Sequence, residues 1–157
     1  MIDAKRRTLL KGSLGVSAVG VAVGAGLLTP SAVLANWPKA AFEAKDTEAA
    51  LNDLLGSNAT ETSDEVKIKA PDIAENGAVV PVTVESGVSG AKSISIMAAG
   101  NSTPLIASFE LGENAVPFVS TRIKMAETAD VIAVVQTDSG LLSAAKPVKV
   151  TIGGCGG

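Results

Sequence analysis

The 157-residue sequence contains no histidine, no tyrosine, one cysteine, one tryptophan and three phenylalanines. Without histidine, the chain has no imidazole to act as a base near neutral pH, which excludes Ser-His and Cys-His catalytic pairs within it. One thiol without any imidazole also leaves too few soft ligands for a zinc or other transition-metal site. We therefore expect no metal and no cofactor, and a core built from valine, alanine, isoleucine and leucine.

Charge is unevenly distributed along the chain, whose formal net charge is −3. Residues 1–35 carry four basic residues and one acid, whereas the remainder carries nine basic and fifteen acidic residues, a net charge of −6. An acidic body with few aromatic rings lacks both the charge that neutralises phosphates and the rings that stack on bases. Nucleic-acid binding is therefore not expected.

Residues 1–35 have the three-part plan of a bacterial export signal. The basic start contains Lys5, the paired Arg6 and Arg7, and Lys11, and it is followed by the apolar, glycine-rich stretch Gly12 to Leu28. Small residues then lead to a cleavage point after Ala35, and the pattern R-R-x-L-L-K resembles the twin-arginine (Tat) signal. An uncleaved anchor is the alternative, because an apolar run of about 17 residues is at the lower limit for spanning a bilayer.

The twin-arginine route carries folded cargo, and it is usually chosen when a protein must acquire a cofactor or a partner before export. Because no cofactor site is visible in the sequence, a partner that travels with the chain is the better explanation. We predict a periplasmic protein that has no membrane attachment after the signal is cleaved.

The body, residues 36–152, begins with a helical pattern and continues with strands. From Trp37 to Leu55, apolar residues recur with a period of 3.6, Asp46-Thr47-Glu48 can begin a second short helix, and Gly56 can end it. From Glu65 onward the period is two, as in half-buried strands. The expected strands lie at residues 66–70, 80–84, 93–96, 105–111, 119–125, 131–135, 141–145 and 148–152.

Turn residues separate these strands about every ten residues, which predicts an antiparallel, immunoglobulin-like β-sandwich preceded by the helical segment. Asp138-Ser139-Gly140 indicates a tight hairpin, and the continuous apolar run Val131–Val135 indicates a strand covered on both sides. Lys67 with Lys69, and Arg122 with Lys124, each share one strand face. We interpret both pairs as solvated faces, and a patch for an anionic partner is the alternative.

The chain ends in Gly153-Gly154-Cys155-Gly156-Gly157, which places its sole cysteine between two glycine pairs. Glycine makes this arm, residues 153–157, flexible and thin, so that the thiol could enter a narrow channel. Cys155 reaches about 10 Å beyond Ile152, and fraying of residues 150–152 would extend that reach. The arm has no basic side chain to favour the thiolate, so we interpret Cys155 as a cargo hook that is activated inside partner active sites.

The twin-arginine signal, the acidic β-rich body and the terminal Gly-Gly-Cys-Gly-Gly together resemble the SoxY family of carrier subunits in the bacterial thiosulfate-oxidising (Sox) system. The resemblance implies that Cys155 holds the sulfur substrate covalently and that the chain is a carrier with no catalytic residues of its own. It also implies a heterodimer with SoxZ, and visits to the haem thiotransferase SoxAX, the thiosulfohydrolase SoxB and, where present, the sulfur dehydrogenase SoxCD.

Three other interpretations remain for the terminal cysteine. An exported interaction module could use Cys155 for a structural intermolecular disulfide, although a disulfide would not require glycines on both sides. A ubiquitin-like sulfur carrier uses a terminal Gly-Gly thiocarboxylate, but it depends on ATP and needs no cysteine. An enzyme acting through Cys155 would lack a histidine base.

Overall fold

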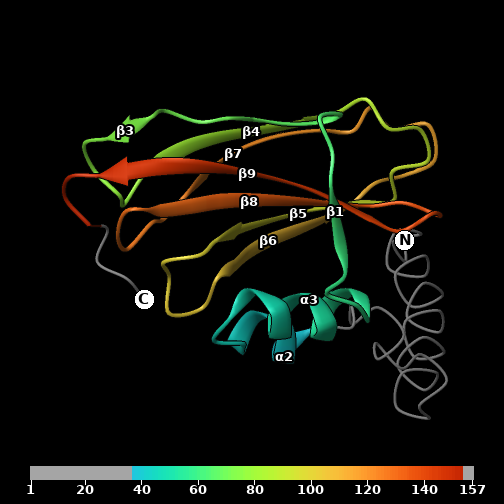
Figure 1. Ribbon diagram of the computed structural model, residues 1–157, viewed down its shortest axis with the longest axis horizontal. Coiled ribbons are helices and arrows are strands. Elements are labelled where there is room, and N and C mark those ends of the chain that lie inside the picture. The colour runs from blue at the N-terminus through green and yellow to red at the C-terminus, as the bar shows by residue number, and fades with distance from the viewer. Residues whose placement is uncertain (1–36, 154–157) are drawn as a thin grey trace, which may run out of the picture. The chain divides into compact units, whose positions relative to one another are not determined.

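The computed structural model describes residues 37–153, which contain two short helices and nine strands (Figure 1). The helices are α2 (Lys39–Glu43) and α3 (Thr47–Leu55). The strands are β1 (Thr60–Thr62), β2 (Val66–Lys69), β3 (Ile73–Ala74), β4 (Val80–Ser86), β5 (Ser93–Ala98), β6 (Leu105–Glu110), β7 (Phe118–Ile123), β8 (Ala129–Gln136) and β9 (Leu141–Val150).

The helical segment divides where the sequence predicted. The Asp46 carboxylate accepts a hydrogen bond from the Ala49 amide over 2.7 Å, so it caps an exposed donor at the start of α3. Gly56 ends the helix in the left-handed region at φ 75°, and its N–H donates to the Asn52 carbonyl over 2.9 Å. Within residues 37–153, neither helix has the length and apolarity needed to cross a membrane.

The strands form two sheets, which confirms the mainly β fold class with a short helical segment. The larger sheet has the order β1-β9-β8-β5-β6, with β3 also paired to β9, and the smaller sheet has the order β2-β4-β7. Most neighbours are antiparallel, but β1 and β3 both pair with β9 in parallel, which differs from the purely antiparallel expectation. Strands of two or three residues are too short for a period-two pattern. The immunoglobulin-like assignment stays a prediction.

Three layers follow from the packing. Apolar side chains from both sheets share one core, to which β5 and β8 contribute Ile94, Ile96, Val131, Ala133 and Val135. A second core lies on the other face of the larger sheet, where α2 and α3 cover Met97, Val134 and Leu141 (Figure 1). All six residues of β5 are therefore buried, including Ser93 and Ser95, which a period-two pattern would place in solvent.

Strand β9 is continuous where the sequence suggested two segments, and it ends two residues earlier than expected. One strand of ten residues, Leu141–Val150, replaces the expected segments 141–145 and 148–152. Pro147 interrupts the apolar pattern, yet it lies opposite Asp130 in the antiparallel pair with β8. Ile152 lies beyond the strand and is exposed.

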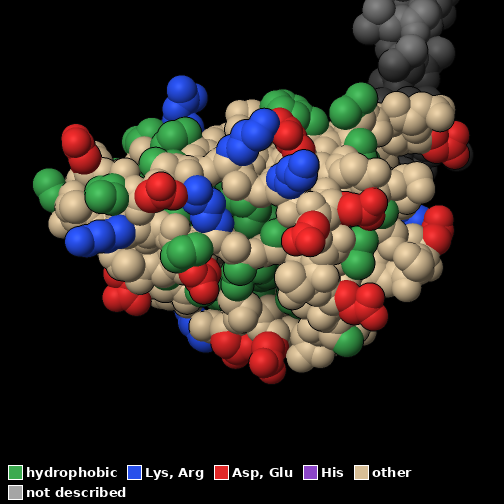
Figure 2. All heavy atoms as spheres, turned by 45° about the horizontal axis from the view of Figure 1, so that its top comes forward, with side chains coloured by type: hydrophobic (Ala, Val, Ile, Leu, Met, Phe, Trp, Pro, Cys, Tyr) green, Lys and Arg blue, Asp and Glu red, His purple; other side chains and the backbone are tan. Residues whose placement is uncertain are grey.

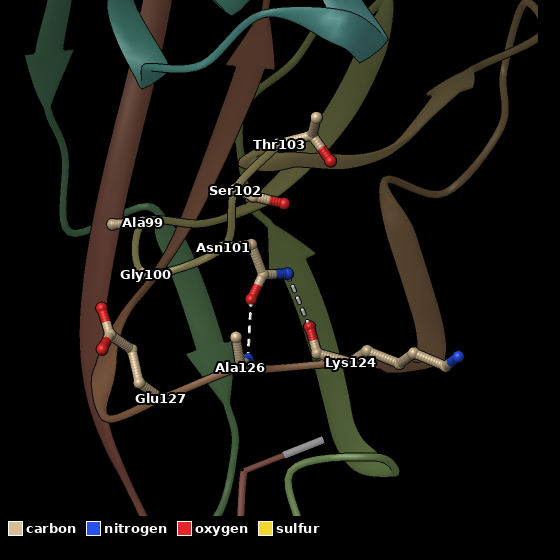
Figure 3. Close-up of a pocket in the computed structure, with 8 residues that line it drawn as sticks. All are labelled: Ala99, Gly100, Asn101, Ser102, Thr103, Lys124, Ala126 and Glu127. Carbon is tan, nitrogen blue, oxygen red and sulfur yellow. Dashed lines mark hydrogen bonds between the residues drawn. The ribbon is translucent and has the colours of Figure 1, made fainter. Parts of the chain in front are cut away.

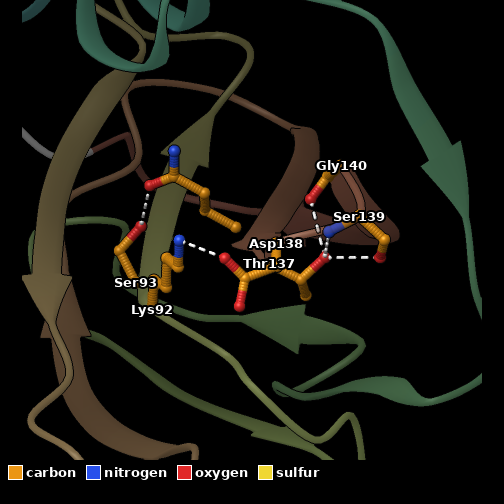
Figure 4. A network of polar contacts seen from close by, with 7 residues as sticks. Lys92, Ser93, Thr137, Asp138, Ser139 and Gly140 are labelled. Carbon is orange, nitrogen blue, oxygen red and sulfur yellow. Dashed lines mark hydrogen bonds and ion pairs between the residues drawn. The ribbon is translucent and has the colours of Figure 1, made fainter.

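The predicted tight hairpin joins β8 to β9 (Figure 4). Thr137 donates its N–H to the Gly140 carbonyl over 2.9 Å, and its hydroxyl contacts the Ser139 hydroxyl over 2.9 Å. Lys92 and Asp138 form an ion pair beside this turn. The buried Ser93 hydroxyl donates to the Gln136 side chain over 3.2 Å, so it is satisfied inside the covered sheet.

Candidate functional site

The segment that carries the predicted chemistry starts where β9 ends. Cys155 and three of its flanking glycines, Gly154, Gly156 and Gly157, lie outside the described residues. The predicted export residues Arg6 and Arg7 also lie outside them. Gly153 is the last described residue, so the structure specifies the point from which the terminal cysteine segment leaves the body. We call residues 151–153 the arm root.

Hydrogen bonds hold the arm root to the segment around β3. The Thr151 N–H donates to the Ala74 carbonyl over 3.1 Å, and its hydroxyl donates to the Glu75 carbonyl over 3.0 Å. The Ile152 carbonyl accepts from the Gly77 N–H over 2.8 Å. These bonds oppose the fraying of residues 150–152 that the sequence suggested as a source of extra reach.

Gly153 lies directly against the loop between β7 and β8. A Cβ built on Gly153 would lie 2.3 Å from the Ala126 carbonyl oxygen, far inside van der Waals contact with a backbone atom. Any side chain at position 153 would therefore push either the arm root or the loop aside. Glycine is required here by the close approach of two backbone segments, in addition to the thinness predicted from the sequence.

The loop that meets Gly153 is itself held by Asn101, in the turn between β5 and β6 (Figure 3). The Asn101 side-chain amide donates to the Lys124 carbonyl over 2.8 Å, and its carbonyl oxygen accepts from the Ala126 N–H over 2.8 Å. One side chain thus satisfies both a donor and an acceptor of an irregular loop. The β5–β6 turn, the β7–β8 loop and the arm root meet at the same end of the sandwich.

An open pocket of about 700 Å³ lies beside this junction. Its lining residues come from the same turn and loop: Ala99, Gly100, Asn101, Ser102, Thr103, Lys124, Ala126 and Glu127 (Figure 3). Lys124 and Glu127 bring opposite charges to it, so the lining has no formal preference for either sign. Within residues 37–153, no cluster of three or more acidic or thiol side chains could hold a metal ion.

Three of the four paired basic residues lie on the outer side of the smaller sheet: Lys67 and Lys69 on β2 and Arg122 on β7 are exposed, and Lys69 pairs with Glu85 over 2.6 Å. Lys124 lies in the loop after β7, so it does not share a strand face with Arg122 as the sequence suggested. Figure 2 turns this side of the molecule toward the viewer and shows basic and acidic side chains interspersed on it. A mixed surface of this kind favours the interpretation as a solvated face over the interpretation as an anion-binding patch.

Comparison with known proteins assigns the chain to a family. The family described as "Sulfur oxidation protein SoxY" matches residues 51–155, which include most of the body and the terminal cysteine. The chain belongs to the SoxY family. Membership supports a sulfur-carrier role in sulfur oxidation, as the resemblance of the signal, the body and the terminal motif implied.

A solved SoxY structure agrees with this assignment. The structure of the sulfur carrier protein SoxY from Chlorobium limicola f thiosulfatophilum is 45% identical in sequence, with a TM-score of 0.60, and the match covers 66% of this chain and 94% of that one. An engineered protein matches at 16% identity and a TM-score of 0.40, over 55% of this chain and 20% of its own. No curated protein matches the sequence.

The sequence revealed the terminal SoxY motif but did not reveal the residues that hold the arm root in place. Asn101 lies between the expected strands 93–96 and 105–111, and nothing in the sequence linked it to Ala126. Gly77 lies between the expected strands 66–70 and 80–84, and nothing in the sequence linked it to Ile152, whose carbonyl accepts from the Gly77 N–H. Both contacts join segments that are far apart along the chain, and a single sequence does not reveal such pairs.

Proposed function

We propose that this SoxY-family chain carries sulfur covalently on Cys155 and presents it to the enzymes of thiosulfate oxidation. The observation that carries the proposal is the placement of the sole cysteine two residues beyond Gly153, directly after the hydrogen-bonded arm root. The segment that carries the thiol therefore starts from a defined point on the body. Family membership supports the same role, since the related solved structure is described as a sulfur carrier protein.

The proposed chemistry balances as an oxidation followed by a hydrolysis. The Cys155 thiolate forms an S–S bond with the sulfane sulfur of thiosulfate, and two electrons pass to an acceptor, which we assign to the haem thiotransferase SoxAX. Water then releases the terminal group as sulfate with two protons, through the thiosulfohydrolase SoxB, and a persulfide stays on Cys155. SoxCD, where present, would oxidise that sulfur further. Cys155 enters the first step as a thiolate and leaves the hydrolysis step as a persulfide, and an alcohol can replace neither role.

We further infer that the chain works in the periplasm after export by the twin-arginine route. The support is the paired Arg6 and Arg7 before an apolar stretch and the small residues that end at Ala35. Replacing both arginines by lysine should leave the precursor in the cytoplasm, whereas mature wild-type protein should begin near Asn36. Normal export of the double variant would overturn this assignment.

The free edges of the two sheets are where we propose that a SoxZ-like partner binds. Among the described residues, β6 ends the larger sheet and β7 ends the smaller one, and neither has a further strand beside it. Unpaired strand edges expose backbone donors and acceptors and are normally covered. Next to the β7 edge, Val116 is 78% exposed and Phe118 is 50% exposed. We propose that a partner covers this side in a one-to-one complex, and a monomeric native protein would contradict that proposal.

Cys155→Ser tests the carrier function. The variant should fold and be exported normally, because the substitution lies in the terminal segment, two residues beyond the end of the described body. It should abolish thiosulfate oxidation by the reconstituted Sox proteins. Intact-mass spectrometry of wild-type protein exposed to thiosulfate and these enzymes should show sulfane-sulfur or thiosulfonate adducts on Cys155 and none on the variant.

Two results would contradict the carrier assignment. Retained thiosulfate oxidation by Cys155→Ser would show that the thiol does not carry the substrate. A Cys155-linked homodimer as the only active form would instead support the structural-disulfide interpretation. An exposed serine such as Ser102 provides the control, since Ser102→Ala should change neither the adducts nor the turnover.

A further inference from the structure

We propose that Asn101 and Gly153 are positioning residues that fix the place and direction in which the Cys155 segment leaves the body. This inference rests on the proposed carrier function, and it assigns roles to two residues outside the cysteine itself. A chain of contacts connects the turn at Asn101, the loop at Ala126, the segment at Gly77 and the arm root. Each contact joins segments that are distant in sequence.

The first step is the loop between β7 and β8. Met125 is fully buried, whereas its neighbours Lys124 and Glu127 are exposed, so the loop is fixed by one apolar anchor. Asn101 adds two hydrogen bonds of 2.8 Å, to the Lys124 carbonyl and from the Ala126 N–H. An amide side chain that bonds both partners sets the orientation of the peptide groups between them. The Ala126 carbonyl belongs to the next peptide group along the chain, one Cα beyond the N–H that Asn101 holds.

The second step connects this loop to the arm root through Gly77. The Met125 N–H donates to the Gly77 carbonyl over 2.7 Å, and the Gly77 N–H donates to the Ile152 carbonyl over 2.8 Å. Gly77 is buried, so these bonds are shielded from competing water. A single residue therefore links the loop that Asn101 holds to Ile152 in the arm root.

The third step is the contact at Gly153. Because a Cβ at this position would lie 2.3 Å from the Ala126 carbonyl oxygen, only glycine lets the chain follow the loop this closely. The Cα of Cys155 can then lie no more than about 7 Å from that of Gly153, at roughly 3.5 Å per residue. Because Cys155 follows Gly153 so closely, a change in the direction of the arm root displaces the thiol by a distance similar to this reach. The exit geometry therefore affects whether the sulfur enters a partner active site.

The experiment compares Gly153→Ala and Asn101→Ala with two matched controls, in the full mature chain with its partner. Gly112→Ala adds the same methyl group at an exposed glycine that has no atom within 4 Å of the new Cβ. Ser102→Ala removes an exposed polar side chain from the same turn as Asn101. Asn101→Asp keeps the acceptor for the Ala126 N–H and loses the donor to the Lys124 carbonyl, so it provides a milder variant if Asn101→Ala folds poorly.

Two readouts separate positioning from general stability. Turnover of the loaded carrier by its partner enzymes should fall about tenfold in kcat/KM for Gly153→Ala and Asn101→Ala, since misplacing a reacting group by an ångström is costly. The reaction of Cys155 with a small aromatic disulfide should stay unchanged. In Asn101→Ala, amide hydrogen exchange should rise about tenfold at Gly77 and Met125 but not at Thr137, whose bond lies in the distant hairpin.

The outcomes distinguish this inference from the carrier function. Normal kcat/KM in both Gly153→Ala and Asn101→Ala, with adducts still forming on Cys155, would overturn the positioning roles and leave the carrier role intact. Equal losses in the Gly112→Ala and Ser102→Ala controls would also overturn them. If the Cys155→Ser variant stayed active in thiosulfate oxidation, the proposed carrier function itself would be overturned. Loss of partner turnover with unchanged small-reagent reactivity, confined to the two positioning variants, supports the proposal.

Discussion

The two sheets of this SoxY-family chain differ in how many of their faces are covered. The larger sheet has the smaller sheet on one face and the two helices on the other, so β5 is buried at every position. In the smaller sheet, β4 and β7 alternate between buried and more accessible residues, because the outer face is in solvent. The same period-two sequence pattern thus corresponds to two different environments.

Serine shows what the difference means. Ser95 in β5 is fully buried and contacts the Ser108 hydroxyl over 3.1 Å, whereas Ser120 in β7 is exposed and contacts the Thr83 hydroxyl over 3.0 Å. Ser95 lies between Ile94 and Ile96, and Ser120 lies between Val119 and Thr121. The two helices, which are distant from both serines in the sequence, cover the outer face of the larger sheet. Ser95 is therefore shielded from water, whereas Ser120 on the uncovered smaller sheet stays hydrated. Substitutions on the two sheets can therefore measure how strongly the helical layer closes the larger sheet.

The largest difference is expected from placing a charge at each serine. Ser95→Asp should lower the free energy of unfolding by about 4 kcal/mol, because it buries a carboxylate without a cationic partner. Ser120→Asp should change it by less than about 0.5 kcal/mol, since the exposed side chain stays hydrated. Urea denaturation followed by circular dichroism provides both values. A small loss in Ser95→Asp would mean that water reaches the face under the helices.

A smaller effect is expected from truncating the apolar residues on opposite faces of β5. Ile96 faces the core between the sheets, and Met97 faces the helices; both are fully buried. Ile96→Ala should cost about 3 to 4 kcal/mol and Met97→Ala about 2 to 3 kcal/mol, through lost burial and the cavity left behind. If Met97→Ala cost less than a surface substitution in the same unfolding measurement, the helical layer would not be a packed second core.

The smallest of these effects concerns the cap of α3. Asp46→Ala removes the side-chain acceptor of the Ala49 N–H and should cost about 1 kcal/mol. Asp46→Asn keeps an acceptor and should recover most of that loss. The thermal unfolding midpoint measures both variants. An equal loss in Asp46→Asn would indicate that the negative charge near the helix start, rather than the hydrogen bond, stabilises α3.

Local patterns predicted the helices and most of the strands. Asp46 and Gly56 marked the ends of α3 because capping depends on a few adjacent residues. The hairpin at Asp138-Ser139-Gly140 was equally local. The parallel pairings of β1 and β3 with β9 were not predicted, because very short strands carry no periodic signal and their partner lies far along the chain. The burial of Ser93 could not be predicted without knowing that the helices cover the second face of the larger sheet.

The candidate site divides in the same way. The sequence alone pointed to Cys155 through its isolation between glycines, and the role of this residue stays a prediction, although the residues that match the family extend to it. Gly153 was predicted to give a thin and flexible arm, but the structure adds a close backbone contact with Ala126. Asn101 carried no distinctive signal, because its importance depends on which loop lies next to its turn.

The sequence by itself determined the chemistry of this protein: one thiol, no imidazole, an acidic body and a terminal motif typical of the SoxY family. These properties depend on residue type and order, which folding does not change. Only the tertiary structure decided which faces of the sheets are buried and how the arm root is held. The first depends on contacts between the helices and β5, and the second on contacts that connect Asn101, Gly77 and the arm root. Such long-range contacts exist only after distant segments have packed together.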